Sequence, residues 1–198
     1  MPPTLLAETV PEEPYMRIGI AAVGIALAAM MAAAQPPQEA KPVEVMLDGL
    51  KSTAPAEWKA EKPANLLRAY QFKVPRGVSD KEDAEVYVLT TVHGTPAENI
   101  ARLKELFVPP TNLPKEKAVR EWDFKNAKAT LTCLDIQGTY YVKNKPIDTA
   151  VKEVRPDYRM IAAVWASKDA SFSIRMVGPK KTVEAHAKEF EQWLRNFK

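Results

Sequence analysis

The sequence has few residues of the kinds that build metal centres and covalent active sites. Among its 198 residues there is one cysteine, Cys133, and there are two histidines, His93 and His186. A single cysteine cannot form a disulfide within the chain, and Cys133 lies in a strand-like segment where a buried thiol behaves as a small apolar residue. Metal sites need several His, Cys or carboxylate ligands at regular spacing. The sequence therefore predicts no metal site and no cofactor.

Motifs of common enzymes are also missing. No serine lies in a G-x-S-x-G turn, and no helix carries H-E-x-x-H. Residues 178–182, Gly-Pro-Lys-Lys-Thr, contain a single glycine and lack the spacing of a phosphate-binding loop. What remains there is a helix N-terminus with Lys180 and Lys181, a place that can hold an anion weakly.

These absences favour a non-catalytic protein and predict no catalytic residue. A small enzyme whose site residues are dispersed along the chain stays an alternative. In that case Asp135, His93 and Tyr140 are the residues to inspect first, because a pocket that gathers two of them with shifted pKa values is typical of an active site.

An export signal is the clearest feature that is present. Arg17 precedes the uncharged run 18–34, which ends in small residues and is followed by a polar, Pro-rich segment. A cut after Ala34 puts Ala32 at position −3 and Ala34 at position −1, as in secretory signal peptides. We therefore expect an exported protein, periplasmic or secreted.

An uncleaved membrane anchor is the alternative for the same segment, and the function expected in that case is a membrane-tethered structural protein. A membrane-spanning helix needs about 20 apolar residues, and the run 18–34 is short for that unless the bilayer thins locally. Residues 1–15 carry three glutamates and no Lys or Arg, the wrong charge for a cytoplasmic flank, so we place the true start at Met16. The predicted division is an upstream extension plus signal peptide or anchor (1–34), a linker (35–42) and one domain (43–198).

The charge of the chain is weakly basic and dispersed. The net charge is +3, and removal of residues 1–34 takes away one basic and three acidic residues, which leaves +5. A nucleic-acid footprint needs clustered Lys and Arg. We expect no nucleic-acid partner, contact with a membrane only through an uncleaved N-terminal segment, and a monomer.

Hydrophobic periodicity predicts an α+β domain. Thr95, Pro96 and Glu98 form a capping box at the start of a helix. In the strand-like segment 66–74 every second residue is apolar, with Arg68 as the exception. Runs of hairpin-linked strands mean an antiparallel sheet, here of about six strands flanked by helices. The predicted strands are 66–74, 84–92, 122–125, 127–141, 158–167 and 171–177, and Gly178-Pro179 is expected to open a terminal amphipathic helix.

Three segments together resemble a known group. They are residues 53–58 (Thr-Ala-Pro-Ala-Glu-Trp), residues 134–140 (Leu-Asp-Ile-Gln-Gly-Thr-Tyr), and a hairpin over 160–176 followed by a helix that ends at Trp193-Leu194. The sequence resembles uncharacterised secreted bacterial proteins, and the architecture resembles the PsbP-like fold. That resemblance implies an accessory binding module, of the kind that serves photosystem assembly or binds the nuclear-transport GTPase. No residue of either binding site is recognisable in this sequence.

One loop is the predicted binding site. Residues 143–156 form a basic, Pro-bounded connection between two strong strands, and long loops in compact domains are functional or disordered. Their positive charge favours an acidic or anionic partner, either a protein or a ligand of the cell envelope. The candidate binding residues are Lys143, Lys145, Lys152 and Arg155, followed by Lys180 and Lys181.

Overall fold

The computed structural model describes residues 42–90, 92–143 and 149–198. These residues all belong to one unit, which begins at residue 39. The predicted export segment, the linker up to residue 41, and Lys145 lie outside the described residues. Within the described ranges, no helix has the length and apolar character needed to cross a membrane.

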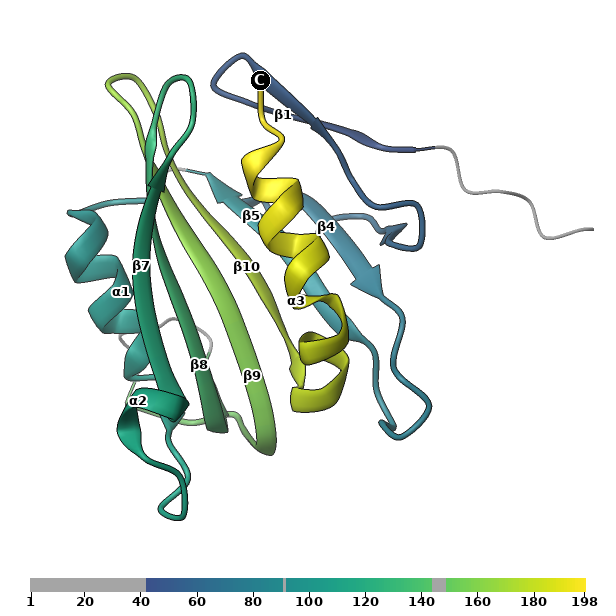
Figure 1. The fold of residues 1–198 in the computed structure, drawn as a ribbon, viewed down its shortest axis with the longest axis vertical. Coiled ribbons are helices and arrows are strands. Elements are labelled where there is room, and N and C mark those ends of the chain that lie inside the picture. Colours follow the sequence, from purple (N-terminus) through teal and green to yellow (C-terminus); the bar gives the residue numbers. More distant parts are fainter. Residues whose placement is uncertain (1–41, 91, 144–148) are drawn as a thin grey trace, which may run out of the picture. The chain divides into compact units, whose positions relative to one another are not determined.

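The described unit is built around one antiparallel sheet of eight strands. Figure 1 shows α3 lying across one face of this sheet. A separate hairpin precedes it, formed by β1 (Glu44–Leu47) and β2 (Leu50–Thr53). The strands of the sheet are β3 (Lys59–Ala60), β4 (Arg68–Val74), β5 (Ala84–Thr90), β6 (Phe107–Val108), β7 (Val119–Lys125), β8 (Thr130–Val142), β9 (Glu153–Ala166) and β10 (Ser171–Pro179). Their order across the sheet is β3-β4-β5-β10-β9-β8-β6, and β7 also pairs with β8.

The helices are α1 (Pro96–Lys104), the short α2 (Lys115–Ala118) and α3 (Lys180–Arg195). The capping box expected at the start of α1 is present: the Glu98 amide donates to the Thr95 hydroxyl, and the Thr95 amide donates to the Glu98 carboxylate. Those bonds lower the pKa of Glu98. The predicted α+β class with an antiparallel sheet is confirmed. The sheet has eight strands instead of about six, and the two strands that the sequence did not predict, β3 and β6, are only two residues long.

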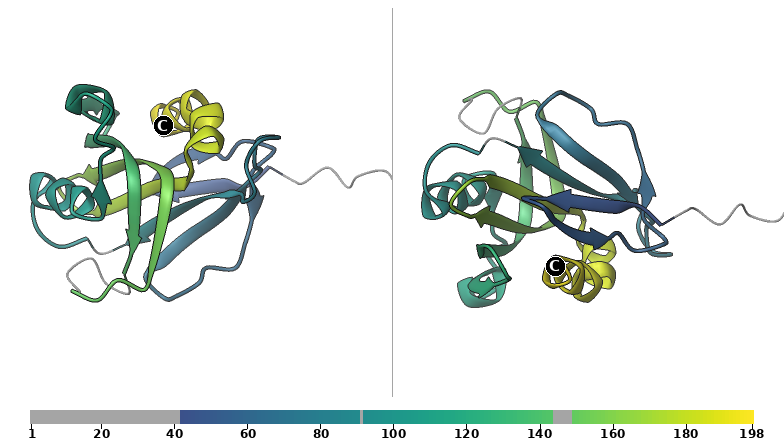
Figure 2. Two further views of the ribbon diagram at one scale, coloured as in Figure 1. Left: turned by 90° about the horizontal axis from the view of Figure 1, so that it is seen from below. Right: turned by 90° about the horizontal axis from the view of Figure 1, so that it is seen from above.

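The two faces of the sheet carry separate hydrophobic clusters. On one face α3 buries an aromatic set, in which Trp193 lies 5.3 Å from Trp58 and 5.4 Å from Phe197 between ring centroids. On the other face α1 packs over β8 and β9 through Ile100 and Leu103. Seen end-on, α1 and α3 lie apart from each other around the curved sheet (Figure 2).

Two predicted boundaries were wrong, and both errors concern proline. The expected loop 143–156 is shorter than predicted, because β9 already begins at Glu153. Pro156 lies within that strand, opposite an irregularity in the pairing: Gly138 pairs with Tyr158, but Tyr140 pairs with Arg155. A bulge of this kind tolerates proline, because a residue there need not donate to the ladder.

The second boundary is the start of the terminal helix. Gly178 and Pro179 are the last residues of β10, and α3 begins at Lys180. A side chain at position 178 would lie 2.5 Å from Cβ of Ala84. The glycine is therefore explained by the close approach of the chain near β5 rather than by a helix start.

Candidate functional site

A polar groove lies on the sheet face that carries α1, lined by residues of β4, β5, β8 and β9. Its volume is about 550 Å³, and Tyr87, Tyr140 and Tyr158 line it. A neighbouring hollow of about 240 Å³ shares Arg68, Tyr87 and Tyr140 with it and adds Arg175. We call these two hollows together the tyrosine–arginine groove. The remaining charged residues that line it are Glu61, Lys73, Arg76, Lys81, Glu82, Asp83, Glu85, Lys143 and Arg155.

Stacked aromatic rings form one side of the groove. The ring centroids of Phe107 and Tyr140 are 4.9 Å apart with an interplanar angle of 25°, and those of Tyr140 and Tyr158 are 6.0 Å apart at 19°. Phe107 belongs to β6, Tyr140 to β8 and Tyr158 to β9. Three adjacent strands therefore hold the rings in place.

A bulge in β9 brings Arg155 into the groove. In a regular strand, side chains alternate between faces, so Tyr158 would share its face with Pro156. The extra residue between Tyr158 and Arg155 changes that alternation, and Asp157 has a positive φ of 54° at this point. As a result the Arg155 guanidinium donates to the Tyr158 hydroxyl over 3.2 Å.

A second bulge, in β4, moves Arg68 to the face of the sheet that carries the groove. Arg68 pairs with Leu89 and Tyr70 with Val88, so one extra residue lies between them. Arg68 therefore leaves the face of Phe72 and lies 3.9 Å above the Tyr87 ring, where a guanidinium is attracted to the aromatic face. Its Nη1 also donates to Glu85 over 2.6 Å.

Tyr140 and Tyr158 are neutral phenols near neutral pH. Burial raises the pKa of Tyr158 to about 12, and its hydrogen bond to Glu82, 2.7 Å long, acts in the same direction. Burial, and then the neighbouring Tyr87, raise the pKa of Tyr140 as well. A general base or acid works best with a pKa near the operating pH. These phenols are therefore unsuited to transferring protons, and the single O–H of Tyr158 is already donated to Glu82.

The cations of the groove differ in how well they are paired. The charge of Arg68 is balanced by Glu85, and Arg155 donates to Glu153 over 2.8 Å, which raises the pKa of Arg155. Arg175 donates to the Ser173 hydroxyl and lies 5.8 Å from the centroid of the Tyr87 ring. Among the described residues, no carboxylate forms an ion pair with Arg175. Its guanidinium is thus available to an anion.

The structure brings only part of the predicted binding set to this groove. Lys143 and Arg155 line it, whereas Lys152 is exposed directly before β9. Lys180 instead lines a different hollow of about 350 Å³, together with Asp135 and Arg159. The last predicted residue, Lys181, is exposed on the first turn of α3.

The hollow around Lys180 is closed by ion pairs between its own residues. Arg159 binds both oxygens of Asp135, at 2.8 and 2.7 Å, and this bidentate contact raises the pKa of Arg159. Arg120 bridges Asp135 at 3.5 Å and Glu191 at 2.8 Å. Because these charges already satisfy one another, this hollow offers less to a ligand than the tyrosine–arginine groove.

The residues suggested for a dispersed enzyme are not gathered. Asp135 pairs with arginines beside α3, Tyr140 stacks on the face of α1, and His93 is exposed before α1. Cys133 is fully buried, and burial raises the pKa of its thiol to about 12. A thiol in that state is a poor nucleophile.

Sequence reasoning missed Arg68, Tyr87 and Arg175 as groove residues. Arg68 carried a signal, because it was the charged exception in an apolar alternation and that exception marks the bulge. Tyr87 and Arg175 carried no such signal in the sequence, since an aromatic or a charged residue within a strand fits many environments.

One further cluster, Glu57, His186 and Glu189, could hold a metal ion.

Comparisons with known proteins add architecture only. No family model and no curated protein matches the chain. The solution structure of cyanobacterial PsbP (CyanoP) from Synechocystis sp. PCC 6803 is similar, with 12% identity and a TM-score of 0.45 over 85% of this chain and 98% of that one. The crystal structure of PA94 from Pseudomonas aeruginosa, a protein of unknown function, is similar with 14% identity and a TM-score of 0.41 over 78% of this chain and 94% of that one. No site residue is transferred from either protein.

Proposed function

We propose that this protein is an exported, non-catalytic binding module that holds an acidic segment of a partner protein in the tyrosine–arginine groove. The observation that carries the proposal is the combination of an unpaired guanidinium, Arg175, with neutral phenols on the floor of one groove. A guanidinium donates hydrogen bonds to carboxylates, and an un-ionised phenol beside it adds no negative charge that would repel them. The export part of the proposal is supported by residues 16–34 of the sequence alone.

The charges along the groove favour an anionic partner over a cationic one. The two carboxylates nearest the tyrosines are engaged, Glu82 with the Tyr158 hydroxyl and Glu85 with Arg68. Lys143 and Arg175 extend the groove at the end away from Glu82. An acidic segment that lies across the groove would therefore meet free cations at one end and the Tyr158–Arg155 pair at the other.

Binding of a fluorescently labelled, glutamate-rich peptide, followed by anisotropy, tests the proposal. The wild-type protein should bind the peptide, and rising salt should weaken the complex because exposed charges are screened. The double variant Arg155→Gln/Arg175→Gln should bind about 10-fold more weakly or worse, since each charge-assisted hydrogen bond contributes about 1.5–3 kcal/mol.

A second pair of cations supplies the matched control. Lys180→Gln/Lys181→Gln removes the same amount of charge away from the groove and should leave the affinity within about twofold, as expected for a change that contributes under about 0.5 kcal/mol. If only the lysine pair matters, the site is the start of α3. If no acidic peptide binds at any salt concentration, the proposed partner class is wrong.

A wider variant tests the loop predicted from the sequence. Replacement of Lys143, Lys145, Lys152 and Arg155 together by Ser should leave the melting temperature nearly unchanged, because surface charges contribute little to stability. It should weaken peptide binding, since it removes Lys143 and Arg155 from the groove, although it keeps Arg175.

A further inference from the structure

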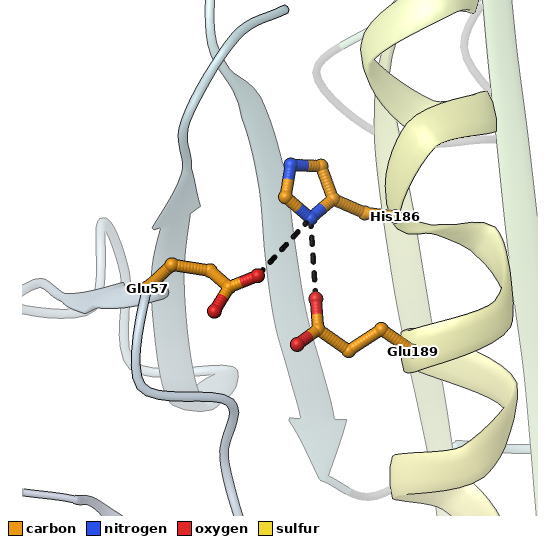
Figure 3. Close-up of side chains that lie close together, drawn as sticks. All are labelled: Glu57, His186 and Glu189. Atoms are coloured by element: carbon orange, nitrogen blue, oxygen red, sulfur yellow. Dashed lines mark hydrogen bonds and ion pairs between the residues drawn. The ribbon is translucent and has the colours of Figure 1, made fainter.

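A second site lies on the other side of the sheet, where α3 meets the turn before β3. Figure 3 shows Glu57 from that turn and His186 and Glu189 from α3 with their side chains pointing toward one another. The Nδ1 atom of His186 is 3.2 Å from Glu189 Oε2 and 3.9 Å from Glu57 Oε1. The ligand atoms of all three residues lie within 4.8 Å of one another.

The backbone determines which nitrogen of His186 carries a hydrogen. Nε2 lies 3.1 Å from the carbonyl oxygen of Pro75, directly after β4. A carbonyl oxygen only accepts hydrogen bonds, so Nε2 is the donor in this contact. In the neutral imidazole, Nδ1 then presents a lone pair to two carboxylates. That arrangement is unfavourable unless a positive centre lies between them.

A proton on Nδ1 supplies that centre incompletely. Such a proton can form a hydrogen bond from Nδ1 to Glu189, but the 3.9 Å between Nδ1 and Glu57 Oε1 is too long for a second hydrogen bond. The protonated imidazole also carries only one positive charge beside two carboxylates, so the cluster keeps a net negative charge. In the described part of the chain, His186 is the only cationic partner that either Glu57 or Glu189 has. A divalent cation bound to the neutral imidazole brings the local charge to zero and contacts all three side chains.

The spacing suits a small cation. Zn²⁺ binds His nitrogen and carboxylate oxygen at about 2.0–2.2 Å in tetrahedral geometry, which places neighbouring ligand atoms about 3.3–3.6 Å apart. The His186–Glu189 separation is already 3.2 Å. Glu57 would have to approach by roughly half an ångström, and its side chain is 49% exposed on a turn, so this movement meets little resistance.

The hydrogen bond from His186 Nε2 to the Pro75 carbonyl oxygen resembles the outer contacts that orient the ligands of known metal sites. A metal-binding histidine usually donates its other ring N–H to a carbonyl or carboxylate, which fixes the ring orientation. His186 itself is 14% exposed and therefore held in place by packing. We propose that Glu57, His186 and Glu189 bind a divalent transition-metal cation, Zn²⁺ first, through Nδ1 and one oxygen of each glutamate.

With three protein ligands, the fourth position of the ion stays open to water or to a partner group, as in open zinc sites. The ion would tie the turn before β3 to α3. Trp58 follows Glu57 directly, and its ring packs 6.1 Å from Phe190 and 5.3 Å from Trp193 between centroids. The site therefore joins the helix to the aromatic core from its exposed side.

Isothermal titration of the chelator-treated full chain with ZnCl₂ tests this inference. The wild-type protein should bind one Zn²⁺ per chain. Glu57→Gln and Glu189→Gln should each raise Kd by about 10- to 100-fold or more, because loss of a ligand costs at least as much as loss of a second-layer contact. The variant His186→Ala should show no stoichiometric binding. Glu57→Gln changes an exposed side chain, so it keeps the test valid if His186→Ala does not fold.

Two controls decide between this site and adventitious binding. His93→Ala removes the other histidine of the chain and should leave Kd unchanged, as should Glu105→Gln at an exposed glutamate. Long-range ¹H–¹⁵N spectra should show Zn²⁺ shifting Nδ1 of His186 while Nε2 keeps its hydrogen. Absence of stoichiometric binding by the wild-type protein, or binding that survives His186→Ala, would overturn the proposal and leave an imidazolium–carboxylate contact.

Discussion

Asp80 and Thr182 lie 102 residues apart in the chain and are joined by two hydrogen bonds. The Thr182 amide and the Thr182 hydroxyl both donate to the same Asp80 oxygen, at 2.7 and 2.6 Å. The residue that caps α3, Pro179, offers no side-chain bond of its own. Asp80, in the turn between β4 and β5, therefore caps the helix from a distant part of the chain. It occupies a helix amide that an external anion at Lys180 and Lys181 would need.

Asp80→Ala should lower the free energy of unfolding by about 1–2 kcal/mol, as expected for loss of an N-cap. Denaturant unfolding monitored by tryptophan fluorescence measures the change. Lys81→Ala, at the exposed neighbouring position, is the control and should stay within about 0.5 kcal/mol of the wild type. Equal stabilities of the two variants would show that the cap contributes nothing.

Phe190→Ala should destabilise the protein by about 3–5 kcal/mol, because it leaves a cavity in the core. Phe190 is fully buried between α3 and the sheet, 5.9 Å from Trp193 between ring centroids. Lys188→Ala on the exposed side of the same helix is the matched control. A loss within about 0.5 kcal/mol for Phe190→Ala, the range of surface substitutions, would mean that α3 is not docked as described.

Gly138→Ala should cost at least about 1–3 kcal/mol, the range for backbone strain. Gly138 has a φ of 149°, and a Cβ there would lie 2.2 Å from the Val108 carbonyl oxygen of β6. Gly77→Ala is the control, since nothing lies within 4 Å of an added Cβ at that position. Thermal unfolding of both variants measures the difference. If Gly138→Ala is as stable as Gly77→Ala, β6 does not approach β8 as closely as described.

The stability of the protein should fall as the pH rises from about 10 to about 12. The pKa of Tyr158 is raised from 10.0 to about 12 in the folded state. Between these values the unfolded chain has lost the phenol proton while the folded chain retains it, so unfolding becomes easier with rising pH. Tyr158→Phe should reduce this slope when unfolding free energies are compared at several alkaline pH values. An identical slope in both proteins would assign the alkaline loss to other groups.

The sequence alone determined the elements whose signals are local. The capping box at Thr95 and Glu98 depends on residues three apart, and the apolar stripe of α3 depends on its helical spacing. Alternation identified β4, β8 and β10, runs of apolar residues identified β5 and β9, and together they gave the antiparallel α+β class. In each case the signal that identifies the element lies within a short stretch of sequence.

Only the tertiary structure decided where the side chains of those elements meet. One extra residue in β4 and one in β9 move Arg68 and Arg155 onto the face of the tyrosines, because a one-residue shift in register exchanges the two faces of a strand. The approach of Glu57 to His186 likewise depends on the packing of a distant turn against α3. The local pattern of a strand or helix carries no information about such pairings, because the pairing energy comes from partners far along the chain.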